Sequence, residues 1–86
     1  MIVKFSRTFR KKYEKLPKPI QQKFDERFEL FLSNTLHPLL ENHPLHGKYA
    51  GCRSINVTGD YRAIFYQESV SAVRFIAIGT HSQLYG

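Results

Sequence analysis

The feature that most constrains the fold is a change in the spacing of apolar residues at Cys52. Beyond this position apolar and polar residues alternate in three runs, residues 53–58, 61–66 and 72–78. Such alternation is typical of strands that are buried on one face only. Gly59-Asp60 and residues 68–71 separate the runs, and both segments are short enough for hairpin turns. The second half of the sequence therefore predicts a three-stranded antiparallel meander.

Before Cys52 the apolar residues recur at helical spacing in two stripes. The stripes are Phe5, Phe9, Tyr13 and Leu16, then Ile20, Phe24, Phe28, Phe31 and Leu32. Ser6 can cap the first helix, and Pro17 and Pro19 separate the two helices because proline is tolerated only in a first turn. With residues 2–5 as a short strand, the sequence predicts an α+β fold of order β-α-α-β-β-β. In this fold a helical hairpin packs on one face of a small antiparallel sheet.

The length and composition of the chain limit its organisation and its surroundings. A chain of 86 residues can bury one small core, so we expect one domain over residues 1–86. The single cysteine cannot form an internal disulfide, which favours a reducing compartment. Residues 1–5 are too short an apolar run for a signal peptide, and no run approaches the roughly twenty apolar residues of a membrane span. We therefore expect a soluble cytoplasmic protein with no membrane partner.

The positive charge of the chain, +6 in total, is concentrated near its start. Basic residues dominate from Lys4 to Lys23, and up to Lys23 only Glu14 interrupts them. A basic region without interspersed acids favours a polyanion such as nucleic acid as partner. The alternative is a solvated helical face that serves solubility.

Three histidines gather in the loop that precedes the meander: His37, His43 and His46. A cluster of imidazoles can bind zinc, but no second thiol and no paired HxxxH spacing accompanies these residues. We therefore expect no metal site.

Two arginines, Arg53 and Arg62, lie in strands whose other residues are largely apolar. An arginine in such a strand needs a partner. One candidate partner is a carboxylate, Asp60 or Glu68, in a buried ion pair. The other is a phosphate, which the guanidinium fork matches with two hydrogen bonds. The pattern alone leaves both open.

The last residues of the chain follow the final strand, which we expect to stop at Gly79. Thr80, His81 and Tyr85 come next, so the strand delivers an imidazole and a phenol to its own rim. This arrangement indicates a functional site. The alternative is a frayed tail that happens to contain a histidine.

Four segments resemble the RelE/ParE superfamily of toxins from bacterial toxin–antitoxin pairs. They are Leu45-His46-Gly47, Tyr49-Ala50-Gly51-Cys52-Arg53, Gly59-Asp60-Tyr61-Arg62-Ala63-Ile64-Phe65 and Gly79-Thr80-His81-Ser82-Gln83-Leu84-Tyr85. The nearest branch is similar to the YafQ-type ribosome-dependent messenger-RNA endonucleases. The resemblance covers essentially the whole chain, and its specific part is residues 43–86.

The resemblance implies a catalytic set of five residues: His43, Asp60, Arg62, His81 and Tyr85. His43, Asp60 and His81 match functional residues of the YafQ-like branch, and Tyr85 stands where that branch has Phe. Arg62 resembles a phosphate-binding arginine of the RelE-like branch instead.

A second implied set would bind RNA: Lys11, Lys12, Lys15, Arg53, Asn56 and Tyr61. One member departs from the pattern, because Asn56 occupies a strand position where the YafQ-like branch has a histidine. Asparagine cannot exchange a proton near neutral pH, so His43 and His81 remain as the titrating pair. Tyr61 or Tyr85 can stack a base of single-stranded RNA.

The function that the resemblance implies is that of a type II toxin cleaving messenger RNA in the ribosomal A site, with no metal and no small-molecule cofactor. The two histidines would divide the acid and base roles, and an arginine would stabilise the phosphorane-like transition state. The basic helices would lie on ribosomal RNA, and a cognate antitoxin protein would neutralise the toxin. Two alternatives are a ParE-like topoisomerase inhibitor, which would not need the histidines, and a catalytically silent binding relative, which Asn56 would suit.

Overall fold

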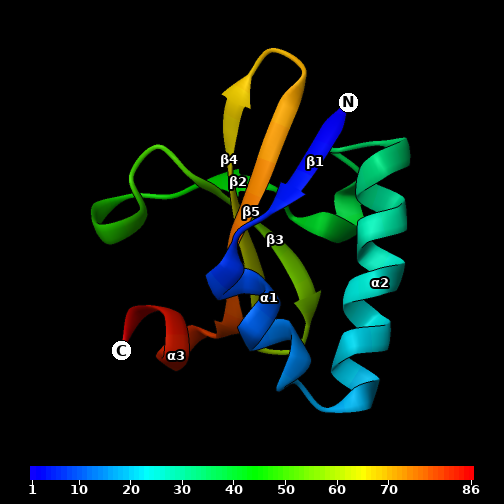
Figure 1. Cartoon of the computed structure of the whole chain (residues 1–86), viewed down its shortest axis with the longest axis vertical. Coiled ribbons are helices and arrows are strands. Elements are labelled where there is room, and N and C mark those ends of the chain that lie inside the picture. The colour runs from blue at the N-terminus through cyan, green and yellow to red at the C-terminus, as the bar shows by residue number, and fades with distance from the viewer.

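Five strands form one sheet in the order β1-β5-β4-β3-β2. The computed structural model describes all residues, 1–86. The strands are β1 (Ile2–Phe5), β2 (His43–Pro44), β3 (Arg53–Thr58), β4 (Tyr61–Ser69) and β5 (Ala72–Thr80). The helices are α1 (Arg7–Glu14), α2 (Lys18–Ser33) and α3 (His81–Tyr85), with two short 3₁₀ helices, η1 (Pro38–Leu40) and η2 (Gly47–Tyr49). Figure 1 shows α2 along one side of the sheet, and the η2 loop and α3 on the other.

The predicted meander is present, because β3, β4 and β5 pair in antiparallel order. β1 is a parallel addition to this meander, with Ile2 opposite Ala72 and Phe5 opposite Phe75 of β5. Parallel neighbours require a long crossover, and the chain between β1 and β5 supplies it. The two-residue β2 extends the opposite edge beside β3. The α+β class and the order of the predicted elements are confirmed, within a mixed sheet.

The boundaries of the helical hairpin follow from local chemistry. The backbone N–H of Phe9 donates to the Ser6 hydroxyl over 3.0 Å, so Ser6 caps α1 as predicted. α2 begins directly after Pro17 and contains Pro19 in its first turn, where a missing N–H costs nothing. No helix in the protein is long and apolar enough to cross a lipid bilayer.

Phenylalanine forms the core between the hairpin and the sheet. The ring of Phe75, on β5, has six phenylalanine neighbours at centroid distances of 5.2–6.0 Å: Phe5, Phe9, Phe24, Phe28, Phe31 and Phe65. Together with Phe75 these are all seven phenylalanines of the chain. Ile55, Val57 and Val73 complete this face and are fully or almost fully buried. Burial of aromatic rings on both layers therefore fixes the hairpin against the sheet.

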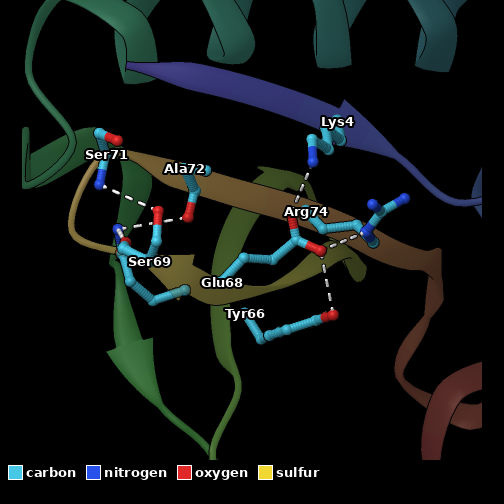
Figure 2. Close-up of polar contacts among 8 residues, drawn as sticks. Lys4, Tyr66, Glu68, Ser69, Ser71, Ala72 and Arg74 are labelled. Atoms are coloured by element: carbon cyan, nitrogen blue, oxygen red, sulfur yellow. Dashed lines mark hydrogen bonds and ion pairs between the residues drawn. The ribbon is translucent and has the colours of Figure 1, made fainter.

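The opposite face of the sheet, here called the open face, carries mainly polar side chains. At one end of it Glu68 lies between two cations, with Arg74 Nε at 2.7 Å and Lys4 Nζ at 3.5 Å (Figure 2). The Tyr66 hydroxyl also donates to Glu68. The Arg74 hydrogen bond is the largest of several influences on the Glu68 carboxyl, and the net effect lowers its pKa. This end of the open face is thus a closed ion-pair cluster, unlike the other end.

Candidate functional site

Arg62 is the central residue of the other end of the open face. Asn56 on β3, Arg62 on β4 and Gly79 on β5 lie side by side in register. Nη1 of Arg62 donates to the Asn56 side-chain oxygen over 2.7 Å, and to the backbone carbonyls of Gly59 and Tyr61 over 3.0 and 3.1 Å. The other guanidinium nitrogens make no hydrogen bond within the protein. One edge of the cation is therefore fixed, and the other is free to bind an anion.

The two carboxylates considered as partners of the strand arginines have other roles. The protein contains three ion pairs, and neither Arg53 nor Arg62 takes part in one. Asp60 is exposed in the β3–β4 turn, and Glu68 binds Lys4 and Arg74. The ion-pair hypothesis is therefore wrong for both arginines. Their hydrogen bonds go to amide side chains and backbone carbonyls. No negative charge therefore offsets the charge of either arginine.

The C-terminal residues form α3 rather than a frayed tail, and β5 continues one residue beyond Gly79, to Thr80. Thr80 and Gln83 make a reciprocal capping box. The Gln83 backbone N–H donates to Thr80 Oγ1 over 3.2 Å, and the Thr80 backbone N–H donates to Gln83 Oε1 over 2.8 Å. These two bonds fix the first turn of the helix, and with it the position of His81.

Gly79 is a packing requirement of the same cap. A Cβ atom at this position would lie 2.8 Å from Gln83 Oε1 and 3.3 Å from Gln83 Cβ. The buried backbone of β5 thus approaches the capping side chain so closely that only glycine leaves it in place.

His81 and Tyr85 lie one turn apart on α3 and face the same way. Their ring centroids are 4.8 Å apart, and Tyr85 also makes an edge contact with Tyr49 of η2, at 5.5 Å. Partial burial raises the pKa of the Tyr85 hydroxyl, the Tyr49 hydroxyl adds to this, and the nearby Arg62 charge opposes it. Tyr85 therefore links α3 to the Arg62 end of the open face. Four predicted residues are thus linked at this end: a hydrogen bond joins Asn56 to Arg62, the charge of Arg62 acts on Tyr85, and the rings of Tyr85 and His81 are in contact.

His43 lies farther along the same face, at the β2 edge. It is exposed and sits opposite Ser54, two positions before Asn56 on β3. Its Nδ1 is 2.7 Å from the Glu41 carbonyl oxygen. A carbonyl can only accept, so Nδ1 carries the proton and Nε2 of the neutral ring presents a free lone pair. The imidazole is thus held with its basic nitrogen available.

Among the other histidines of the loop, His37 has a structural role. The His37 ring accepts from the Leu39 backbone N–H over 3.1 Å and so caps η1. No group of three or more His, Cys, Asp or Glu side chains in the structure is arranged to hold a metal ion.

Two predicted RNA-binding residues lie on the helix-covered side of the sheet. Arg53 is three positions from Asn56 in β3, so the two side chains point to opposite faces. Its Nε donates to the Asn42 side chain over 2.7 Å. Tyr61 alternates with Arg62 and packs against the phenylalanine core. The structure does not bring Arg53 or Tyr61 into the cluster around Arg62.

The three candidate lysines are all exposed: Lys11 and Lys12 lie on α1, and Lys15 is its C-cap residue. Lys12 and Lys15 lie on the α1 side that faces α3, where they line a hollow of about 360 Å³, and Lys11 does not line it. None of the three is in an ion pair.

Sequence reasoning missed two residues that hold α3 in place. Nζ of Lys48 donates to the Leu84 carbonyl over 3.2 Å, which satisfies one of the open carbonyls at the end of a helix. Tyr49 supports the Tyr85 ring. Neither residue has a local signature, since both act on a segment more than thirty positions away.

The capping role of Gln83, in contrast, can be predicted from the sequence, because Thr80-x-x-Gln83 fits the capping-box spacing.

Known toxins share this fold over its whole length. The protein is 26% identical to YafQ from Escherichia coli strain BL21(DE3), with 98% of this chain and 97% of that chain covered and a TM-score of 0.83. A chain of the E. coli DinJ-YafQ toxin–antitoxin complex matches at 27% identity, 98% and 96% coverage and a TM-score of 0.80. A chain of the toxin–antitoxin complex RelBE2 from Mycobacterium tuberculosis matches at 26% identity, 93% and 96% coverage and a TM-score of 0.67.

No curated protein sequence matches the chain significantly. A comparison with sequence families, however, agrees with these structures. The family described as "Bacterial toxin of type II toxin-antitoxin system, YafQ" matches residues 1–86. The resemblance seen in the sequence is thereby confirmed. The chain belongs to the YafQ family, and it is a RelE-like toxin of the type II toxin–antitoxin class.

Proposed function

We propose that this toxin is a metal-independent endoribonuclease that cleaves messenger RNA in the ribosomal A site. The observation that carries the proposal is the half-free guanidinium of Arg62, held by Asn56 beside the Tyr85 and His81 pair. A fixed cation with open donors suits a phosphodiester whose charge increases in the transition state. An imidazole and a phenol next to it suit proton transfer and base stacking.

Each residue has a definite role in this reaction. His43 Nε2 takes the proton of the ribose 2′-hydroxyl, whose oxygen then attacks the neighbouring phosphorus. Arg62 stabilises the resulting phosphorane. The bond from phosphorus to the 5′-oxygen breaks, and His81 gives that oxygen a proton. The products are a 2′,3′-cyclic phosphate and a 5′-hydroxyl, with no oxidant, metal or cofactor consumed. Asn56 positions Arg62, and Tyr85 stacks on a base.

Asp60 has a secondary role in this proposal. It is exposed and unpaired at the turn whose Gly59 carbonyl accepts from Arg62. In this proposal its negative charge lowers the attraction of Arg62 for anions without forming an ion pair. Lys11, Lys12 and Lys15 on α1 supply phosphate contacts to RNA, which do not depend on its sequence.

The decisive experiment maps cleavage ends on ribosomes programmed with a defined messenger. The parent protein should generate cuts within the A-site codon that end in 2′,3′-cyclic phosphate. His81→Ala should retain the parent melting temperature, because the residue is exposed, and should cut about 10²–10⁴ times more slowly in single turnover. Equal rates for parent and variant would remove His81 from the mechanism. An inactive parent would favour the silent binding relative.

We also propose a cognate antitoxin protein as partner, as in the DinJ-YafQ and RelBE2 complexes. A groove of about 460 Å³ between α1 and α2 has an apolar floor of Phe5, Phe9, Phe24 and Phe28. Its rim carries charges of both signs: Arg10, Glu14 and Asp25. This combination suits an amphipathic helix of a protein better than it suits RNA. Co-expression of a small adjacent reading frame should restore growth that the toxin alone arrests, and growth unaffected by the toxin alone would contradict a toxin function.

A further inference from the structure

The hollow beside α3 differs in chemistry from the groove between α1 and α2. It lies where β1 no longer covers β5, since β1 pairs only with residues 72–75. α1 and α3 enclose it from two sides, and Figure 1 shows these helices near one another at the same end of the sheet. Its lining includes Lys12, Lys15, Tyr49, Tyr61 and Gln83.

The charge in this hollow is entirely positive. Lys12 and Lys15 are exposed and free of ion pairs, and the lining contains no Asp or Glu. Two phenol rings and an amide provide flat surfaces and hydrogen-bonding groups next to the two ammonium groups. Cations beside aromatic rings are the usual means of binding a phosphate and a base of a single strand together.

The hollow is also connected to the candidate active site through α3. Gln83 and Leu84 line the hollow, while His81 and Tyr85 belong to the Arg62 cluster. Tyr49 contacts both regions, since it lines the hollow and touches the Tyr85 ring. The two regions thus lie on either side of α3, and a helix with its side chains is about 10–12 Å wide. One RNA strand can reach both.

We propose that this hollow is a subsite for a nucleotide that flanks the cleaved bond of single-stranded RNA. Lys12 and Lys15 bind its phosphate, and its base stacks on Tyr61. The volume of about 360 Å³ is at the lower end of the range for small-molecule sites, which suits one nucleotide. This proposal rests on the proposed nuclease function and extends it. It also gives Tyr61 an RNA-binding role apart from the Arg62 cluster.

The test uses the full-length protein and short oligoribonucleotides of one to six units. Each oligonucleotide carries 2′-O-methyl groups, which prevent cleavage, and binding is measured at low salt from amide chemical shifts. The affinity of the parent for these oligonucleotides should rise about tenfold in one step, between two successive lengths. The longer of the two is the first that fills both the hollow and the Arg62 cluster. The amides of Tyr49 and Tyr61 should shift only from that length onwards.

Two double variants separate the subsite from general electrostatics. Lys12→Ala with Lys15→Ala should remove the step. The control, Arg7→Ala with Lys18→Ala, removes the same charge from exposed positions outside the hollow and should keep the step. A third variant, Tyr61→Phe, keeps the ring and should also keep the step.

The possible outcomes decide between the two proposals. A parent that shows no step, or no shift at Tyr49 and Tyr61, overturns the subsite. Equal loss at every length in both double variants also overturns it, because the lysines would then act only through total charge. A stepwise rise in affinity without any cleavage on ribosomes supports the subsite and contradicts the nuclease function. Cleavage without such a rise contradicts the subsite and supports the nuclease function.

Discussion

The two faces of the sheet show how this chain divides stability from chemistry. The helix-covered face packs six phenylalanines around Phe75, with five of the seven rings buried, and contains no ion pair. The open face carries Arg62, Asn56, His81 and Tyr85 at one end and the Glu68 cluster at the other. The first face is filled by packed side chains, whereas the second leaves part of the Arg62 guanidinium without a hydrogen-bond partner. Substitutions on the two faces should therefore change different measurements.

The largest effect is expected from Phe75→Ala, at the centre of the helix-covered face. The side chain is fully buried, so its removal should lower the free energy of unfolding by about 3–5 kcal/mol. A small domain has little more stability than this, and much of the variant should be unfolded in a thermal or urea melt. Phe75→Leu should lose clearly less, because it keeps most of the volume. A loss below about 1 kcal/mol for Phe75→Ala would show that the core does not depend on this ring.

The helix-covered face was also the part of the fold that the sequence predicted best. Helical spacing of Phe9, Phe24 and Phe31 and period-two alternation in the strands each reflect burial on one side, which local sequence records. The parallel pairing of β1 with β5 was not predicted, because contacts between the two ends of a chain leave no local pattern. Neither was β2, whose two residues are too few to show any periodicity.

The candidate site was predicted by residue type but not by arrangement. His81 and Tyr85 are brought together by a helix whose cap, Thr80 with Gln83, has the sequence spacing of a capping box. The partners of Arg62 were missed because turn carbonyls carry no sequence signature. The alternation of side chains along β3 separates Arg53 from Arg62. Arg53 and Asn56 are three positions apart and point to opposite faces, and Asn56 pairs with Arg62.

The second prediction tests whether the open face needs α3 in one position. Gly79→Ala should displace the Gln83 side chain, break one bond of the capping box and move His81. Single-turnover cleavage should fall about 10- to 100-fold, while stability should fall by only about 1 kcal/mol. Gln83→Ala removes the same bond without the clash. The combined variant should therefore be no slower than Gln83→Ala alone, and additive losses would contradict this account of Gly79.

The third prediction concerns the hold of Asn56 on Arg62. Asn56→Ala removes the 2.7 Å hydrogen bond and keeps the two carbonyl contacts. The loss of one such bond to a charged group should slow cleavage by about tenfold. Asn56→Asp should slow it further, because a carboxylate would neutralise the guanidinium that the phosphate needs. Asn56→His restores the residue of the YafQ-like pattern and should preserve or raise the rate. An Asp variant as fast as the parent would exclude a phosphate-binding role for Arg62.

The smallest effect should come from the far end of the open face, where Glu68 is already paired. Its pKa is lowered first by the Arg74 hydrogen bond, against partial burial, and then by the Arg74 and Lys4 charges. A carboxyl whose pKa is lower in the folded state adds stability above its unfolded pKa, roughly 4.3. That stability is lost as the pH falls through the folded pKa. The melting temperature of the parent should therefore fall more steeply below about pH 4.5 than that of Glu68→Gln. At pH 7 the Glu68→Gln variant should be the less stable of the two proteins.

Cleavage at neutral pH should be the same for both proteins, because Glu68 lies at the opposite end of the open face from Arg62. A slower Glu68→Gln enzyme with an unchanged melting curve would instead show that the whole open face, and not one end of it, binds RNA.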